Sequence, residues 1–461
     1  MTIEQSPKRP GGIAVDERLR VPGGSGTAHE LPRRLGLVAT TAIVIGTIIG
    51  SGIFRVPASV AGAVGVPAGV AVVWILGGLI TLCGALSLAE LAAAYPRTGG
   101  VFVYLREAYG PLIAFLFCWT MLFLAPGALA GIALVFAEYL GTLVSLSPDG
   151  VQLAAAITLA ACGALAYRSV SGVGGLVSVA TFAKVGAIAA LVFVAFLLGN
   201  GSEGSLGAGA PPATDARWGG IGLGLVAALW AYNGFQDMVS CAGEVRDPAR
   251  TLPRALITGM LIVIGVYLAA NAAYLYVLPF DVLRTSTLVA SDTMVRIIGD
   301  TGAAAVAAMV MTSTFGAVIG VTLLYPRIFF AMADAGLLFR PLARVHPRFR
   351  TPHVAVAAQT TAAVLFALSR SFEQLTAAFV LGIWPFLALA TVAVIVLRRR
   401  HPDLQRPYRT PGYPIVPLIF VAGTAWVIGS ALIADPLTTL AGIGLTLLGV
   451  PVYWFWKRAS Q

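Results

Sequence analysis

The chain has 461 residues, of which 58% are hydrophobic and only 11% are charged, and its mean hydropathy is +0.87. A soluble domain carries about 25% charged residues, so this composition excludes an ordinary soluble protein. Long stretches without an ionisable residue recur along almost the entire sequence, which indicates a protein embedded in a membrane.

Twelve stretches have the length and apolarity of membrane-spanning helices, which need about 20 apolar residues each. The first five, interrupted only by Lys184 in the fifth, are residues 35–54, 56–89, 108–137, 150–167 and 169–201. The other seven are residues 218–236, 255–280, 301–326, 352–369, 374–397, 410–434 and 436–456. None shows the alternating pattern of a membrane barrel, so the predicted fold class is an all-α integral membrane protein with twelve transmembrane helices.

The positive charges predict the orientation of these spans. If the amino terminus is inside, most Lys and Arg residues fall in inner segments, which is the side they favour. We therefore expect a multi-pass protein of a cytoplasmic membrane with both termini in the cytoplasm. The same distribution explains the net charge of +10 without a nucleic acid partner. Residues 1–33, rich in Gly and Pro, are expected to form a disordered cytoplasmic tail.

Two spans contain sequences that interrupt a helix, at corresponding places in the two halves of the chain. The first span holds Gly50-Ser51-Gly52, and the sixth holds Asn233-Gly234. A broken helix exposes backbone groups that are tolerated in a membrane where they line a ligand site. Free N–H groups suit a carboxylate and free carbonyls suit an ammonium, so the pair predicts a site for a zwitterion. The alternative is that the glycines only allow close helix packing.

Lys184 lies in the middle of the fifth span, with no acid within one helical turn. A lysine at that depth costs about 3 kcal/mol and usually faces the protein interior. Burial disfavours its charged form, so it is a candidate proton carrier, whereas a fixed ammonium could replace a metal cation. The alternative is a lysine that reaches the membrane surface or only braces a helix. Asp237, one turn beyond the second break, fits a gate or a structural ion pair equally well.

Four passages resemble the amino acid–polyamine–organocation (APC) superfamily, in particular its bacterial amino acid permeases and the light subunits of heteromeric amino acid exchangers. They are Gly50-Ser51-Gly52-Ile53-Phe54, Tyr95-Pro96-Arg97-Thr98-Gly99-Gly100, Glu244-Val245-Arg246-Asp247-Pro248 and Pro407-Tyr408-Arg409-Thr410-Pro411-Gly412. The resemblance implies the LeuT-type fold, in which two inverted repeats of five helices enclose the substrate. The repeats would be residues 34–202 and 218–397, joined by an external loop at residues 203–217. Residues 398–461 would form helices eleven and twelve and a short carboxyl-terminal tail.

The resemblance also implies the residues that bind substrate. Backbone N–H groups at the first break would bind the substrate carboxylate, and carbonyls at both breaks would bind its ammonium. The expected substrate-binding residues are Ile48, Gly50, Ser51, Gly52, Trp230, Ala231, Asn233 and Gly234. The Trp230 indole would close the site from outside. Lys184 would stand where sodium-coupled relatives bind sodium, which favours proton symport or amino acid exchange and makes it the expected coupling residue.

These features predict a secondary active transporter of neutral L-amino acids that is independent of sodium, in a bacterial cytoplasmic membrane. Neutral substrates are favoured because Asn233 offers no acid to a second cation; the alternative is a basic amino acid or polyamine exchanger. No intramembrane His, paired acids or nucleophile–base spacing indicates an enzyme, and we expect no catalytic group, cofactor or metal. The expected partners are the amino acid, a proton and membrane lipid. No obligatory partner subunit is expected, since the external cysteine of partnered relatives is missing beside the third helix.

Overall fold

The computed structural model describes residues 35–97, 99–168, 173–201, 218–334, 336, 338–349 and 351–459. All of them belong to one unit of mutually contacting residues, 32–461. The tail expected over residues 1–33 and the external loop expected over residues 203–217 lie outside the described residues.

Helices make up nearly all of the described chain. The first group is α1 (Leu37–Ile48), α2 (Gly52–Val64), α3 (Pro67–Ala94), α4 (Val101–Tyr109), α5 (Pro111–Val144), α6 (Pro148–Arg168) and α7 (Val173–Leu198). It is followed by α8 (Trp218–Ala231), the 3-10 helix η2 (Met238–Glu244), α9 (Pro248–Val277), α10 (Phe280–Thr285), α11 (Val289–Ile298) and α12 (Asp300–Asp334). The last group is η3 (Arg340–Ala343), α13 (His353–Ser369), α14 (Phe372–Arg400), α15 (Ile415–Ala434) and α16 (Pro436–Ala459).

The helical architecture confirms the predicted class of membrane protein. Within the described residues, nine helices are long and apolar enough to cross a membrane, and α1 with α2 would form a tenth span bent by 43°. Two shorter apolar helices, Gly220–Ala231 and His353–Ser369, lie in other predicted spans. A helix satisfies its backbone hydrogen bonds internally, as a lipid environment requires.

One predicted span boundary is wrong. Residues 56–89 are predicted as a single span, but α2 ends at Val64 and α3 begins at Pro67. Gly65 ends α2 in the left-handed conformation, with φ of 71°, and Pro67 fits the first turn of the next helix. The search for charge-free stretches missed this turn because none of its residues is charged.

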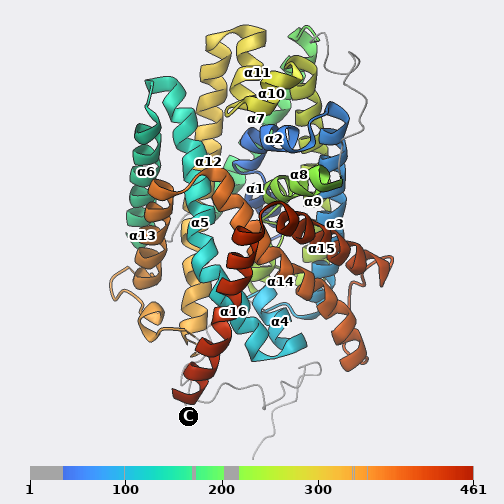
Figure 1. The fold of residues 1–461 in the computed structure, drawn as a ribbon. Coiled ribbons are helices and arrows are strands. Elements are labelled where there is room, and N and C mark those ends of the chain that lie inside the picture. The colour runs from blue at the N-terminus through green and yellow to red at the C-terminus, as the bar shows by residue number, and fades with distance from the viewer. Residues whose placement is uncertain are drawn as a thin grey trace, which may run out of the picture. The chain divides into compact units, whose positions relative to one another are not determined.

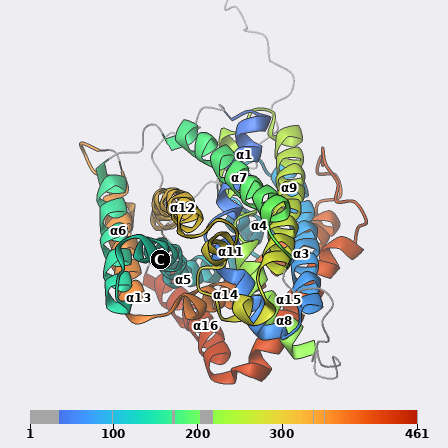
Figure 2. The ribbon, with the colours of Figure 1, turned by 90° about the horizontal axis from the view of Figure 1, so that it is seen from above.

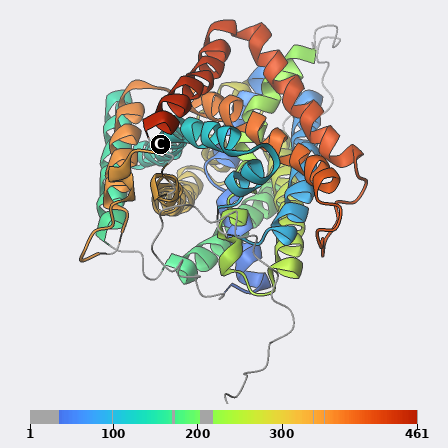
Figure 3. The same cartoon turned by 90° about the horizontal axis from the view of Figure 1, so that it is seen from below.

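The helices surround the two interrupted segments. Figure 1 shows α1, α2 and α8 in the middle, with α10 and α11 towards one end and α4 towards the other. The pair α6 and α13 packs against α5. Seen from the end that carries α10 and α11, α7 and α9 lie next to α1 (Figure 2). From the opposite end, α15 and α16, orange-red and red, lie along the outer side (Figure 3).

A buried carboxylate joins α3 to the last turn of α14. Glu90 is 1% exposed and accepts hydrogen bonds from Arg398 Nε at 2.8 Å and Nη2 at 2.7 Å. It also accepts one from the Thr410 backbone N–H at 2.7 Å, and Arg406 Nε lies 3.6 Å away. These charge-assisted contacts fix the segment before α15 against α3 and the end of α14.

Candidate functional site

The first span breaks within the predicted cluster. α1 ends at Ile48, and α2 resumes at Gly52 in a new direction. Within the described residues, the N–H groups of Ser51 and Gly52 donate to no other backbone carbonyl. They are free donors at the start of α2, where the helix dipole also favours an anion.

The sixth span breaks at Asn233-Gly234, as predicted. α8 ends at Ala231, and residues 232–237 form turns before η2. Gly234 has φ of +114°, a conformation that residues with a side chain rarely adopt. The Asp237 N–H donates to the Gly234 carbonyl at 3.0 Å, which closes one of these turns.

The two breaks lie against each other. A Cβ at Gly52 would be 2.6 Å from Ala231 Cα, and a Cβ at Gly234 would be 2.7 Å from the Thr47 carbonyl oxygen. The Thr47 hydroxyl lies 3.2 Å from the Gly234 carbonyl. Close packing, the alternative explanation for the glycines, is therefore present together with the break. Only glycine at positions 52 and 234 allows the breaks to form and to pack this closely.

Tyr267 of α9 connects the breaks, and sequence reasoning missed it. Its hydroxyl lies 3.0 Å from the Ile48 carbonyl oxygen and 3.0 Å from that of Ala231. The ring is fully buried and packs edge-on against Trp74. A tyrosine in an apolar span indicates a buried hydroxyl that needs a hydrogen-bond partner. The sequence does not show that its partners are carbonyls at the ends of α1 and α8.

Lys184 points to the first break. Its side chain is 8% exposed, and Nζ donates to the Ile49 carbonyl at 3.3 Å. The ammonium therefore does not reach a membrane surface, and no ion pair joins it to another described residue. It caps a carbonyl that the break leaves without a helical partner.

A cavity of about 400 Å³ lies at the junction of the breaks. Seven of the predicted site residues line it: Ile48, Gly50, Ser51, Gly52, Lys184, Trp230 and Asn233. Ala231 and Gly234 do not, because they lie where the two breaks touch. Other walls come from α5, through Ala128 and Ile132, and from α12. The cavity thus combines free backbone donors, carbonyls at the breaks whose oxygens can each accept a second hydrogen bond, and one buried cation.

The cavity extends in one direction and is closed in the other. Leu35, Glu244 and Arg327 line its far part, beyond the start of α1. At the other end, the Trp230 ring packs edge-on against Phe379, with ring centroids 5.5 Å apart, and against Phe372 at 6.2 Å. A substrate could therefore leave only towards the start of α1 in this conformation.

An ion cluster lies near the closed end. Arg55 of α2 donates to Glu373 of α14 at 2.6 Å, and its Nε lies 3.4 Å from Glu138 of α5. Its guanidinium also lies 5.7 Å from the centre of the Phe372 ring, which contacts Trp230. The cluster joins three helices beside the closed end. Sequence reasoning did not include these residues in the site, because they lie on three helices that are far apart in the sequence.

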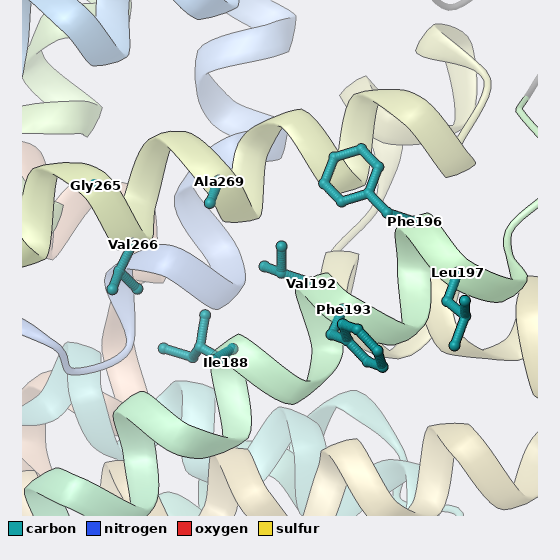
Figure 4. Close-up of a pocket in the computed structure, with 9 residues that line it drawn as sticks. Ile188, Val192, Phe193, Phe196, Leu197, Gly265, Val266 and Ala269 are labelled. Atoms are coloured by element: carbon teal, nitrogen blue, oxygen red, sulfur yellow. The ribbon is translucent and has the colours of Figure 1, made fainter.

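A second cavity, of about 570 Å³, lies between α7 and α9 (Figure 4). Its walls are aliphatic and aromatic side chains, among them Val192, Phe193 and Phe196. It contains none of the predicted site residues and offers no charged partner to a zwitterion. The cavity at the breaks is therefore the candidate functional site.

Known proteins resemble this chain over nearly its whole length. Residues 35–450 match the sequence model of a family described as amino acid permease. The chain is 32% identical to the serine/threonine exchanger SteT of Bacillus subtilis, over 93% of this chain and 98% of that protein. It is 31% identical to the human large neutral amino acids transporter small subunit 2, over 98% of this chain and 86% of the relative. It is 29% identical to the human cystine/glutamate transporter, over 92% and 85% of the two chains.

Proposed function

The chain belongs to the amino acid permease family, and we propose that it carries neutral L-amino acids across the membrane by alternating access. Transport proceeds by amino acid exchange or proton symport and does not use sodium. The observation that carries this proposal is the cavity at two broken helices, which offers free N–H groups and carbonyls to one zwitterion. The relatives bear the names of transporters and exchangers, which supports transport without catalytic chemistry.

The proposed fold is the LeuT-type arrangement of twelve spans. The helices support twelve if α1 with α2, and α8 with η2, each form one interrupted span. The other ten are α3, α5, α6, α7, α9, α12, α13, α14, α15 and α16. The interrupted spans would then open two repeats, residues 34–202 and 218–397, and residues 398–461 would follow them.

The substrate's charges suit opposite sides of the junction. We place the substrate carboxylate on the N–H groups of Ser51 and Gly52, and its ammonium on carbonyls of Ile48, Trp230 and Asn233, which line the cavity. The Tyr267 hydroxyl has one proton, so it can donate to only one of its two carbonyl neighbours at a time. A carbonyl oxygen has two lone pairs and can accept from both the tyrosine and the ammonium.

The closed end would face the outside, since the positive charges favour cytoplasmic termini. The structure then corresponds to an inward-facing conformation, with its cavity reaching Glu244 and Arg327. Opening to the outside would separate Trp230 from Phe372 and break the pair between Arg55 and Glu373. We propose that the chain works in a bacterial cytoplasmic membrane without an obligatory partner subunit, since residues 145–147, between α5 and α6, include no cysteine.

One observation favours the second candidate, a basic amino acid or polyamine exchanger. Asp237 lines the cavity, and its carboxylate could bind a second cationic group. Neutral substrates remain our first choice because position 233, at the break itself, is an asparagine. The name of the relative SteT, a serine/threonine exchanger, also supports this choice.

Uptake by proteoliposomes tests both candidates. We expect labelled L-serine, L-alanine or L-leucine to enter liposomes that contain the purified chain, with internal amino acid or an inward proton gradient, and without sodium. Uptake only into preloaded liposomes indicates exchange, whereas accumulation that a protonophore abolishes indicates symport. Stronger competition by L-arginine or putrescine than by these neutral amino acids would establish the second candidate instead. Uptake equal to that of protein-free liposomes for every compound would contradict both.

A further inference from the structure

Asp237 carries a carboxylate that the proposed contacts to a neutral substrate do not use. It lies in the turns between α8 and η2 and borders two cavities. One is the substrate cavity, and the other is a space of about 30 Å³ that Ser240 and Tyr325 also line. A space of this size accommodates one water molecule. Asp237 therefore lies between the substrate cavity and a pocket large enough for a water.

No ion pair joins Asp237 to a described residue. Its one side-chain hydrogen bond within that part of the chain comes from Gln236 Nε2, at 3.3 Å. The other titratable or charged groups that line the two cavities are Lys184 of α7, Cys241 and Glu244 of η2, and Tyr325 and Arg327 of α12. Unpaired carboxylates at membrane depth are costly and often mark the path of a proton or ion.

Gln236 connects this carboxylate to the helix break. The same Nε2 that donates to Asp237 also lies 3.1 Å from Asn233 Oδ1. The amide oxygen of Gln236 accepts from the Gly234 N–H at 3.2 Å. One neutral side chain therefore contacts the carboxylate and both residues of the Asn-Gly break. A change in the charge of Asp237 alters the strength of a hydrogen bond that positions the break.

We propose that Asp237 binds a proton from the cavity water during transport, and that Gln236 transmits its charge state to the substrate-binding break. The inference rests on the proposed transport function. An O–H bond of a hydronium ion in the cavity breaks as one forms at the carboxylate, and the proton later returns to water on the side to which the cavity opens. Charged Asp237 accepts a strong hydrogen bond from Gln236, which holds the Asn-Gly break in the arrangement that binds the substrate ammonium, and the neutral carboxyl weakens this hold. Acid therefore weakens substrate binding.

The pH dependence of exchange tests the role of the charge. Between about pH 8 and about pH 5.5, the KM of the wild type for its best-exchanged neutral amino acid is expected to rise about fivefold. Asp237→Asn should show the high KM at both pH values, whereas Asp237→Glu should retain the response. Gln236→Leu should lose the response, because it removes the connection to the break. Asp403→Asn, which neutralises an exposed carboxylate outside the cavity, is the control and should behave as wild type. A wild-type response in Asp237→Asn would overturn the proposal.

Infrared difference spectroscopy tests the proton directly, without any transport. Acidification of the reconstituted wild type should produce a protonated-carboxyl band that is missing in Asp237→Asn and present in Gln236→Leu and Glu244→Gln. If the wild type exchanges amino acids but Asp237→Asn shows the same band as wild type, Asp237 is not the proton site. The proposed transport function would then still hold. A band that depends on Asp237, in a wild type that exchanges no amino acid, would support the proton site and contradict the proposed function.

Discussion

Amino acid exchange is expected to fall strongly when Gly234 is replaced by alanine. Gly234 has φ of +114°, and its missing Cβ would lie 2.7 Å from the Thr47 carbonyl oxygen. The added methyl group would therefore have to separate the two breaks or change the turn between them. Strain of roughly 1–3 kcal/mol at the substrate-binding backbone corresponds to a loss of about 5-fold to 150-fold in exchange. The initial rate of exchange in proteoliposomes, per amount of inserted protein, measures it.

Gly320→Ala is the matched control for this substitution. Gly320 lines the same cavity from α12, and no atom lies within 4 Å of the position that its Cβ would take. We expect this variant to exchange at close to the wild-type rate. Equal rates for Gly234→Ala and wild type would show that the contact between the breaks is not needed for transport.

Replacing Lys184 by methionine is expected to reduce transport by at least about tenfold, because the Ile49 carbonyl loses its cationic donor in a buried site. Methionine retains the length and apolar stem of the side chain but carries neither charge nor proton. The initial rate of exchange and the accumulation driven by a proton gradient are the two readouts. A loss of both indicates that the ammonium holds the break, and a loss of accumulation alone indicates a role in coupling.

Phe182→Met provides the control on the same helix. Phe182 is 60% exposed, so its replacement leaves the cavity unchanged. Wild-type exchange is expected for this variant. Unchanged proton-driven accumulation in Lys184→Met would remove the lysine from the coupling step.

The breaks and the lysine were accessible from sequence because each violates a simple local rule. Residues that weaken a helix stand together in Gly50-Ser51-Gly52 and Asn233-Gly234, and a lysine is costly in a lipid-facing span. These residues therefore stand out without any knowledge of their neighbours. The structure places Ser51, Asn233 and Lys184 around one cavity, although the last two are 49 positions apart in the chain.

The residues that were missed depend on contacts between distant helices. The Tyr267 hydroxyl reaches carbonyls of α1 and α8, and Arg55 meets carboxylates from α5 and α14. A tyrosine or an arginine near an apolar span is common, so its type alone does not reveal these partners. The turn at Gly65 was missed for a different reason, since an uncharged turn leaves no mark in a search for charge-free stretches.

The central claim is that the transported amino acid occupies the cavity between the breaks, and protection of a cysteine placed there tests it most directly. Gly320→Cys would be made with the four native cysteines replaced by alanine, and its reaction with a polar thiol reagent measured in proteoliposomes. The account predicts that the best-exchanged amino acid slows this reaction by at least about fivefold at saturation. It predicts no change at Asp403→Cys, an exposed position outside the cavity. Equal reaction rates at Gly320→Cys with and without that amino acid, in a protein that still exchanges it, would contradict the account.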